Sequence, residues 1–167
     1  EFKVAESAVP QATFEYLASL EWIRAKENLV LVGPAGTGKS HLLVALGHAA
    51  VSAGLRVRYF AAIDLVESLY RGLADNSVGR ILDGLMRSDL LICDELGFAP
   101  LDATGSQLFF RFVAAAYERR SLAVASPTEG RRSTSSSASA STCYSGGAVS
   151  QWISRLLGTE SGTELLT

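Results

Sequence analysis

Residues 33–40 read Gly-Pro-Ala-Gly-Thr-Gly-Lys-Ser and match the phosphate-binding loop pattern G-x-x-x-x-G-K-S at every fixed position. An apolar run over 29–32 precedes this loop, and a helical pattern over 39–53 follows it. Strand, glycine-rich loop and helix in this order are the context in which the pattern binds phosphate. The alternative, a glycine turn with a solvated lysine, is disfavoured by these flanking segments. The chain is therefore expected to bind a nucleoside triphosphate.

The residue types in the loop suit this ligand. Gly33, Gly36 and Gly38 allow positive φ and let backbone N–H groups approach an anion. Lys39 is expected to reach the β- and γ-phosphates, and the Ser40 hydroxyl is expected to ligate Mg²⁺. The residues expected to contact the nucleotide are Gly33, Pro34, Ala35, Gly36, Thr37, Gly38, Lys39, Ser40 and His41. For His41, a contact with phosphate or metal and a plain surface position both remain open.

A second informative stretch, residues 90–95, reads Leu-Leu-Ile-Cys-Asp-Glu. An apolar run that ends in two carboxylates indicates a buried parallel strand, and ligands bind beyond the carboxyl ends of such strands. Asp94 is therefore expected to hold Mg²⁺, and Glu95 is expected to polarise an attacking water as general base. The alternative is a pair of solvated carboxylates at a strand end. Cys93 is expected to be an inert residue within the strand.

The remaining pattern predicts one α/β domain with a parallel sheet flanked by helices, which is a P-loop NTPase architecture. Further strands are expected over 57–60 and 122–125, with helices beginning at Asp64 and covering 78–86 and 104–119. The chain has 167 residues and a net charge of −2, so no bulk basic character indicates a nucleic-acid partner.

Other features bear on where the chain resides. Cys93 and Cys143 share no metal-ligand spacing, and no segment has the length of a membrane span or the pattern of a secretion signal. A cytoplasmic protein without membrane contact is expected. The chain begins Glu-Phe without methionine, which is compatible with a fragment or a processed chain.

Three stretches resemble the IstB-like ATP-binding proteins: G-P-A-G-T-G-K-S-H-L, L-L-I-C-D-E-L-G-F-A-P-L-D and Y-E-R-R-S. These proteins are helper ATPases of insertion-sequence transposition in the AAA+ class, close to the DnaC-type helicase loaders. The resemblance covers about residues 3–126. It implies a module that binds ATP and Mg²⁺, assembles on DNA as a homo-oligomer and recruits or regulates a transposase. An ATPase site at a subunit interface, with an arginine supplied in trans, is also implied.

The resemblance stops at Ser126-Pro127, where the family usually has a polar pair whose second residue helps to position water. Proline has no N–H and no polar side chain, so ATP hydrolysis is expected to be weak or absent. Nine of the fifteen residues over 131–145 are Ser or Thr. The expected organisation is an N-terminal linker or helix over 1–27, an incomplete ATPase core over 28–126 and an irregular, poorly ordered tail over 127–167.

Two accounts of the tail remain open: a change of reading phase in a damaged gene copy, and a genuine flexible Ser-rich segment. Arg155 lies in a faint counterpart of a family segment whose arginine is a sensor or finger, and it is not expected to have that role. Three functions therefore remain open: a transposition helper ATPase, a DnaC-like helicase loader and a non-catalytic nucleotide-binding remnant. DNA contact follows only from the resemblance, because no basic stripe with interleaved aromatic residues is present.

Overall fold

The structure, a computed structural model, describes residues 11–96, 101–127 and 142–144. Its strands are β1 (Leu29–Gly33), β2 (Val57–Ala61), β3 (Leu90–Asp94), β4 (Ser121–Pro127) and β5 (Thr142–Tyr144). Its helices are α1 (Gln11–Ser19), α2 (Glu21–Arg24), α3 (Lys39–Ser52), α4 (Ala62–Ala74), α5 (Val78–Leu85) and α6 (Ala103–Ala116). No described helix is both long and apolar enough to cross a bilayer.

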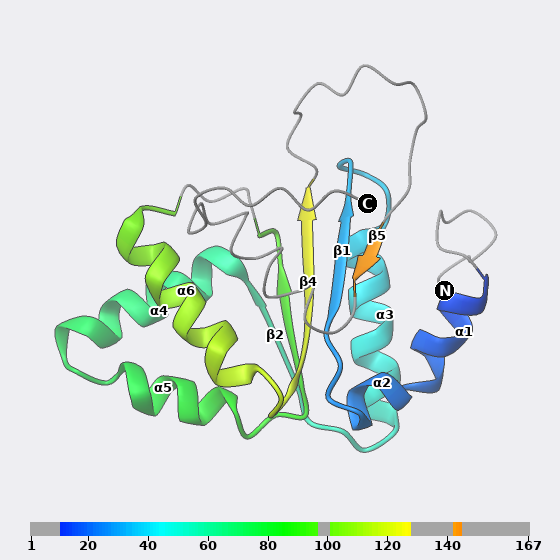
Figure 1. Cartoon of the computed structure of the whole chain (residues 1–167), viewed down its shortest axis with the longest axis horizontal. Coiled ribbons are helices and arrows are strands. Elements are labelled where there is room, and N and C mark those ends of the chain that lie inside the picture. Colours follow the sequence, from blue (N-terminus) through cyan, green and yellow to red (C-terminus); the bar gives the residue numbers. More distant parts are fainter. Residues whose placement is uncertain (1–10, 97–100, 128–141, 145–167) are drawn as a thin grey trace, which may run out of the picture.

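The described strands form one sheet in the order β2-β3-β4-β1-β5 (Figure 1). Strands β1 to β4 run parallel, and β5 pairs antiparallel with β1. Parallel neighbours require crossover connections, and the helices α3 to α6 lie in these connections. The structure therefore confirms the predicted α/β architecture. The loop after β1 and the acidic pair at the end of β3 both lie at the carboxyl ends of the parallel strands, and β4 runs between these two strands.

The sheet separates two apolar layers, because side chains alternate between its faces along each strand. In β3, Leu91 and Cys93 join the cluster beneath α4, α5 and α6, whereas Leu90 and Ile92 join the cluster with α1, α2 and α3. The same alternation continues through β1 and β4. Asp94 is next in the series of Leu90 and Ile92, so it belongs to the face covered by α3.

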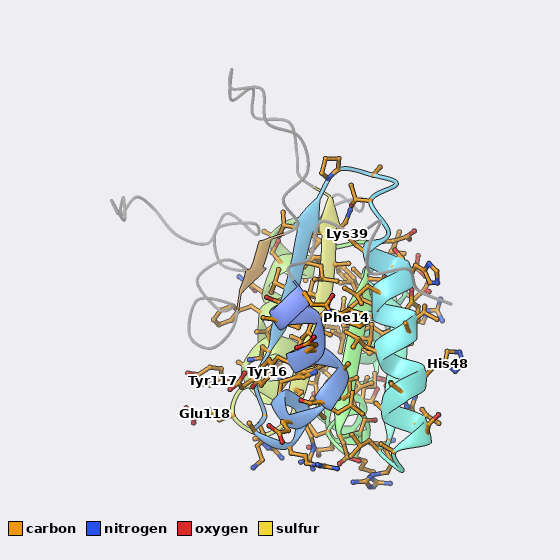
Figure 2. The ribbon with its side chains drawn as sticks, turned by 90° about the vertical axis from the view of Figure 1, so that its right-hand side faces the viewer. Phe14, Tyr16, Lys39, His48, Tyr117 and Glu118 are labelled. Carbon is orange, nitrogen blue, oxygen red and sulfur yellow. The ribbon has the colours of Figure 1, made fainter. Side chains whose placement is uncertain are left out.

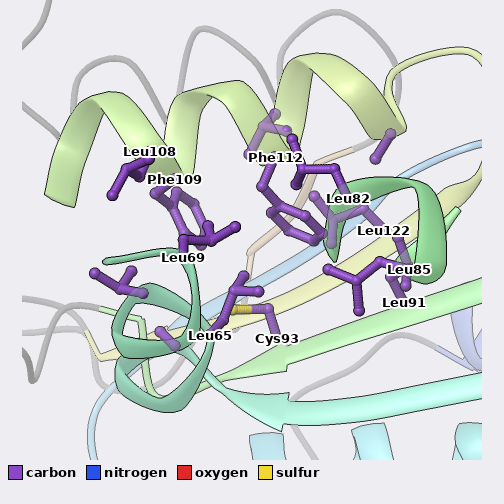
Figure 3. Packing of buried hydrophobic residues seen from close by; sticks show 14 of the residues in the cluster. Leu65, Leu69, Leu82, Leu85, Leu91, Cys93, Leu108, Phe109, Phe112 and Leu122 are labelled. Atoms are coloured by element: carbon purple, nitrogen blue, oxygen red, sulfur yellow. The ribbon is translucent and has the colours of Figure 1, made fainter. Parts of the chain in front are cut away.

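The larger cluster lies between α6, α4, α5 and the sheet (Figure 3). Phe112 of α6 is fully buried and meets Phe60 of β2 edge to face, with 5.7 Å between ring centroids. Phe109 lies beside it at 5.8 Å. Offset and edge-on pairs of this kind add to the free energy gained by burying the rings.

The helices before β1 are attached to the sheet by buried polar contacts. The Trp22 indole donates to the carbonyl of Leu17 at 3.1 Å. The Ser121 hydroxyl of β4 donates to the carbonyl of Ile23 at 3.2 Å, and the Asn28 side chain accepts from the N–H of Leu122 at 2.9 Å. The bond of Trp22 joins α2 to α1, and the other two join this region to β4 across more than ninety positions, so α1 and α2 form an integral layer on the α3 face (Figure 1).

Two features differ from the simple periodic pattern. The predicted helix over 104–119 ends earlier, because Tyr117 has extended backbone angles and Glu118 has a φ of 56°, which turns the chain toward β4. Strand β5 lies within the segment 127–167 that is expected to be irregular. Residues 128–141 and 145–167, including Arg155, lie outside the described residues.

Gly72 of α4 provides a stability prediction. A Cβ built there would lie 2.7 Å from Ile81 Cδ1 and 3.2 Å from the backbone nitrogen of Val78. Alanine is the better helix former by about 1 kcal/mol, but overpacking of this kind opposes it by ~1–3 kcal/mol. Gly72→Ala is therefore expected to lower the free energy of unfolding by about 1 kcal/mol in urea titrations.

Gly84 of α5 is the matched control, because a Cβ at this position meets no atom within 4 Å. Gly84→Ala is expected to raise the free energy of unfolding by about 0.5 kcal/mol. Equal stability of Gly72→Ala and Gly84→Ala would show that α4 does not pack as closely against Val78 and Ile81 of α5 as the structure has it.

Candidate nucleotide-binding site

The loop between β1 and α3 turns through two glycines in the left-handed region. Gly36 has a φ of 81°, and Gly38, the N-cap of α3, has a φ of 83°. At Gly36 the requirement is conformational, because an added Cβ meets no atom within 4 Å. Gly33 does not use the freedom that the sequence suggested: its φ is not positive, and it ends β1 in register with Pro127.

The helix that follows presents a positive end to the loop. The 14-residue α3 has no side-chain cap at Gly38 and no acidic residue in its first turn. Its first N–H groups have no partner within the helix, and its dipole favours negative charge at that end. A glycine-rich turn in front of such a helix forms an anion site.

Lys39 lies beneath the loop at the end of the sheet (Figure 2). Its ammonium group donates to the carbonyl oxygens of Gly33 at 2.8 Å and Pro34 at 2.7 Å, and to Thr37 Oγ1 at 3.3 Å. Thr37 Oγ1 itself donates to the Pro34 carbonyl at 2.9 Å, which closes the turn. Desolvation lowers the pKa of Lys39 from its ordinary value, and the charge of Asp94 opposes this shift. The carbonyl and hydroxyl oxygens of the loop thus hold the ammonium group of Lys39.

At the end of β3 the chain turns sharply at Asp94 and Glu95, which together form the acidic turn. Asp94 is only 4% exposed; its Oδ1 accepts from the N–H of Glu95 at 2.8 Å, and its Oδ2 accepts from the Tyr59 hydroxyl at 2.6 Å. Glu95 has a φ of 60°, an uncommon conformation for a residue with a side chain. The N–H of Leu96 then donates to the carbonyl of Ala125 in β4, which fixes the turn to the neighbouring strand.

Both predicted motifs meet in one cavity of about 330 Å³. Its lining residues are Ala35, Gly36, Gly38, Lys39, Ser40, His41, Asp94, Glu95, Ala125 and Ser126. Gly33, Pro34 and Thr37 do not line it; they contribute the oxygen atoms that hold Lys39. The fold therefore brings the loop and the acidic pair together, although more than fifty residues separate them in sequence.

The sequence did not predict Ala125 as a lining residue or the contact of Tyr59 with Asp94, and Ser126 entered only through the resemblance, as the first residue of the pair Ser126-Pro127. Ala125 and Ser126 enter the site because β4 lies between β1 and β3. Tyr59 reaches it because β2 pairs with β3. The sequence predicted all of these strands but carried no signal for their order, so these residues could not be assigned.

The donor set can be tested for the expected metal. Ser40 offers a hydroxyl and Asp94 a buried carboxylate on the same cavity, and oxygen ligands of this kind suit Mg²⁺. In the part of the chain that the structure describes, no cluster of three His, Cys, Asp or Glu side chains forms a metal site. Mg²⁺ usually keeps waters and binds phosphates together with one or two protein oxygens, so the residues fit this cation.

His48 and Cys93 do not line this cavity. His48 points outward from α3 (Figure 2) and lines a separate groove with Val44, Val51 and Tyr59. Burial raises the pKa of the Cys93 thiol well above its ordinary value, so the thiol stays neutral within β3. This agrees with its predicted inert role.

Comparison with known proteins connects this site to a family. The family model for IstB-like ATP binding protein matches residues 1–130. The ATP-binding protein of insertion sequence IS21 from Pseudomonas aeruginosa is 38% identical over 110 residues, which are 66% of this chain and 42% of that protein. Its IS232 counterpart from Bacillus thuringiensis subsp. berliner is 32% identical over 121 residues, 72% of this chain and 48% of that protein. The chain thus spans less than half the length of these relatives.

Solved structures agree on the fold. The DnaC helicase loader superposes with a TM-score of 0.64 at 20% identity, covering 93% of this chain and 88% of that one. AMPPCP-bound DnaA from Aquifex aeolicus also gives 0.64, at 25% identity, covering 75% of this chain and 40% of that one. The fold is that of the AAA+ P-loop ATPases. By its sequence and by the loop and acidic strand that build this cavity, the chain belongs to the family of IstB-like ATP-binding proteins.

Proposed function

We propose that this chain binds ATP with Mg²⁺ in the cavity between the loop and the acidic turn, as a helper module in the transposition of an insertion sequence. The observation that carries the proposal is the meeting of Lys39, Ser40, Asp94 and Glu95 on one cavity. The similarity to ATP-binding proteins of insertion sequences supports the transposition role.

Each residue has a distinct task in this proposal. The N–H groups of the loop and of the first turn of α3 bind the phosphate oxygens. Lys39 exchanges its carbonyl partners for the β- and γ-phosphates, and Ser40 and Asp94 hold the cation. When bound there, Mg²⁺ would supply positive charge that neutralises the triphosphate. Glu95 orients a water for attack on the γ-phosphorus and accepts its proton, while the bond from that phosphorus to the β–γ bridging oxygen breaks and ADP leaves.

Hydrolysis is expected to be slow. The end of β4 carries Ser126 on the cavity wall and Pro127 opposite Gly33. The resemblance implies a polar water-positioning residue at position 127, and proline has no N–H with which to hold a water. The groups expected to bind ATP are therefore present in the cavity, whereas the polar residue expected to position the attacking water is replaced by Pro127.

The wider setting is also part of the proposal. A cytoplasmic location, contact with DNA, a transposase partner and assembly into a homo-oligomer are all proposed from the family resemblance. A helicase loader is the alternative protein-remodelling role, and a nucleotide-binding remnant is the alternative without catalysis. Stimulation by duplex DNA together with transposase capture supports transposition, and capture of a replicative helicase supports the loader.

The test compares ATP–Mg²⁺ binding and phosphate release by wild type and Glu95→Gln, with and without duplex DNA. Glu95→Gln is expected to keep its ATP affinity and to lower any turnover by about 100-fold, because the amide cannot accept the proton. Glu118→Gln is the matched control: Glu118 also has positive φ, 56°, but lies at the opposite end of the sheet (Figure 2).

Equal turnover in wild type and Glu95→Gln would contradict the role given to Glu95. ATP binding without any turnover in wild type would favour the non-catalytic alternative. Absence of ATP–Mg²⁺ binding by folded wild-type protein would remove the proposed function itself.

A further inference from the structure

We propose that Tyr59 is a positioning residue for Asp94, and that its hydroxyl holds the carboxylate in the orientation needed for the metal. This inference rests on the proposed ATP–Mg²⁺ site and assigns to that site a residue from the edge strand β2. The carrying observation is the 2.6 Å hydrogen bond that the Tyr59 hydroxyl donates to Asp94 Oδ2.

The sheet register explains how this contact arises. Strand β2 pairs in parallel with β3, with Tyr59 opposite Ile92 and Ala61 opposite Asp94. Side chains two positions apart on a strand point to the same face, so Tyr59 and Asp94 are diagonal neighbours on the face covered by α3. A long tyrosine side chain spans that diagonal, and its hydroxyl meets the carboxylate.

The carboxylate is held from both of its oxygens. Oδ2 accepts from Tyr59, while Oδ1 accepts from the N–H of Glu95 at 2.8 Å. Two donors from different segments restrict rotation of the carboxyl group, and each oxygen retains a lone pair for a further ligand. Asp94 is 4% exposed, so bulk water contributes little to its orientation. Partners that orient a ligating carboxylate in this way set the affinity of metal sites.

A plain packing role is the competing explanation for Tyr59. Its ring borders a groove of about 300 Å³ with Val57, Ile92 and residues of α3, and the residue is 49% exposed. Packing requires the ring, whereas positioning requires the hydroxyl. Tyr59→Phe keeps the ring and removes the donor, so this substitution separates the two explanations.

The experiment measures metal affinity directly. Mn²⁺ binding to the protein–ADP complex is followed by electron paramagnetic resonance, and ATP affinity is measured with Mg²⁺ and with EDTA. Tyr59→Phe is expected to raise the half-saturating metal concentration about tenfold. Its ATP affinity in EDTA is expected to match that of wild type, because the loop and Lys39 are untouched.

Tyr70→Phe is the matched control. The Tyr70 hydroxyl also donates to an aspartate, Asp102, which caps α6 by accepting from the N–H of Gly105 at 2.7 Å. This variant loses the same kind of bond outside the cavity, so its metal affinity is expected to equal that of wild type. In an Asp94→Asn background, Tyr59→Phe is expected to cause no further change in metal affinity.

Equal metal affinity in wild type and Tyr59→Phe overturns the inference while leaving the proposed function in place. A loss of ATP affinity in EDTA also overturns it, because the hydroxyl would then act on the nucleotide site without the metal and not through the orientation of a metal ligand. If wild type binds no ATP at any metal concentration, the proposed function fails, and the inference built on it falls as well.

Discussion

Replacing Lys39 with alanine is expected to weaken ATP–Mg²⁺ binding by about 100-fold or more, the effect of removing a charged hydrogen-bonding partner of roughly 3 kcal/mol from a preorganised site. The ammonium group lies inside the loop, bonded to the carbonyls of Gly33 and Pro34. These two carbonyl oxygens hold the ammonium group of Lys39 at the place where the phosphate oxygens of ATP are expected to bind. Among the described residues that line the cavity there is no other lysine and no arginine to replace it.

Two measurements check this prediction. Calorimetric titration gives the affinity, and thermal unfolding with ATP–Mg²⁺ gives an independent readout, because a ligand at 100 times its dissociation constant stabilises a protein by about 2.7 kcal/mol. Wild type is expected to show this stabilisation, and Lys39→Ala is expected to lose it. Without ligand, the variant should unfold within about 1 kcal/mol of wild type, because water can take the place of the ammonium group as donor to the carbonyls of Gly33 and Pro34.

The control for Lys39→Ala is Arg71→Ala. Arg71 forms an ion pair with Glu67 at 3.4 Å on the surface of α4, and both side chains are mostly exposed. The loss of one positive charge is the same, but nucleotide affinity is expected to stay at the wild-type value. If both variants weakened binding equally, net charge and not the loop lysine would determine affinity.

Phe112→Ala is expected to lower the free energy of unfolding by about 3–5 kcal/mol, a large share of the ~5–15 kcal/mol typical of a folded domain. Phe112 is fully buried, pairs with Phe60 and Phe109, and joins α6 to the sheet (Figure 3). Truncation removes the ring and leaves a cavity that this packed layer cannot fill by small shifts. Chemical denaturation measures the loss directly.

Phe110→Ala is the matched control, on the same helix and with the same atoms removed. Phe110 is 43% exposed, so its truncation is expected to change the free energy of unfolding by less than about 1 kcal/mol. If Phe110→Ala and Phe112→Ala lost equal stability, α6 would not face the sheet with Phe112 and solvent with Phe110, as the structure has it. The folded fraction of Phe112→Ala is expected to bind ATP normally, because the ring lies on the face of the sheet away from α3.

Much of the site could be predicted because its signals are local. The loop lies within eight consecutive residues, and its glycines, lysine and serine each match a specific requirement of phosphate binding. An apolar run ending in Asp94 and Glu95 predicts a buried parallel strand, whatever its neighbours are. The two motifs could be joined in advance because parallel strands deliver their carboxyl ends to the same edge of a sheet.

Other features depended on long-range contacts. Strand β5 pairs with β1 from within a segment that has no apolar periodicity. The predicted helix over 104–119 ends at Ala116, because the chain must reverse there to enter β4. Periodicity continues past this point in sequence, but the backbone does not follow it.

Local chemistry in the chain was thus enough to identify the phosphate loop, the acidic strand end and the α/β class, since each depends on residues that are close together in sequence. The order of the strands determined which further residues lie next to the loop and the acidic strand end. Ser126 lines the cavity because β4 lies between β1 and β3, and Tyr59 reaches Asp94 because β2 pairs with β3. Strand order is set by how whole layers of helices pack on the two faces of the sheet. Because this packing joins segments that are far apart in sequence, no short stretch of sequence can predict it.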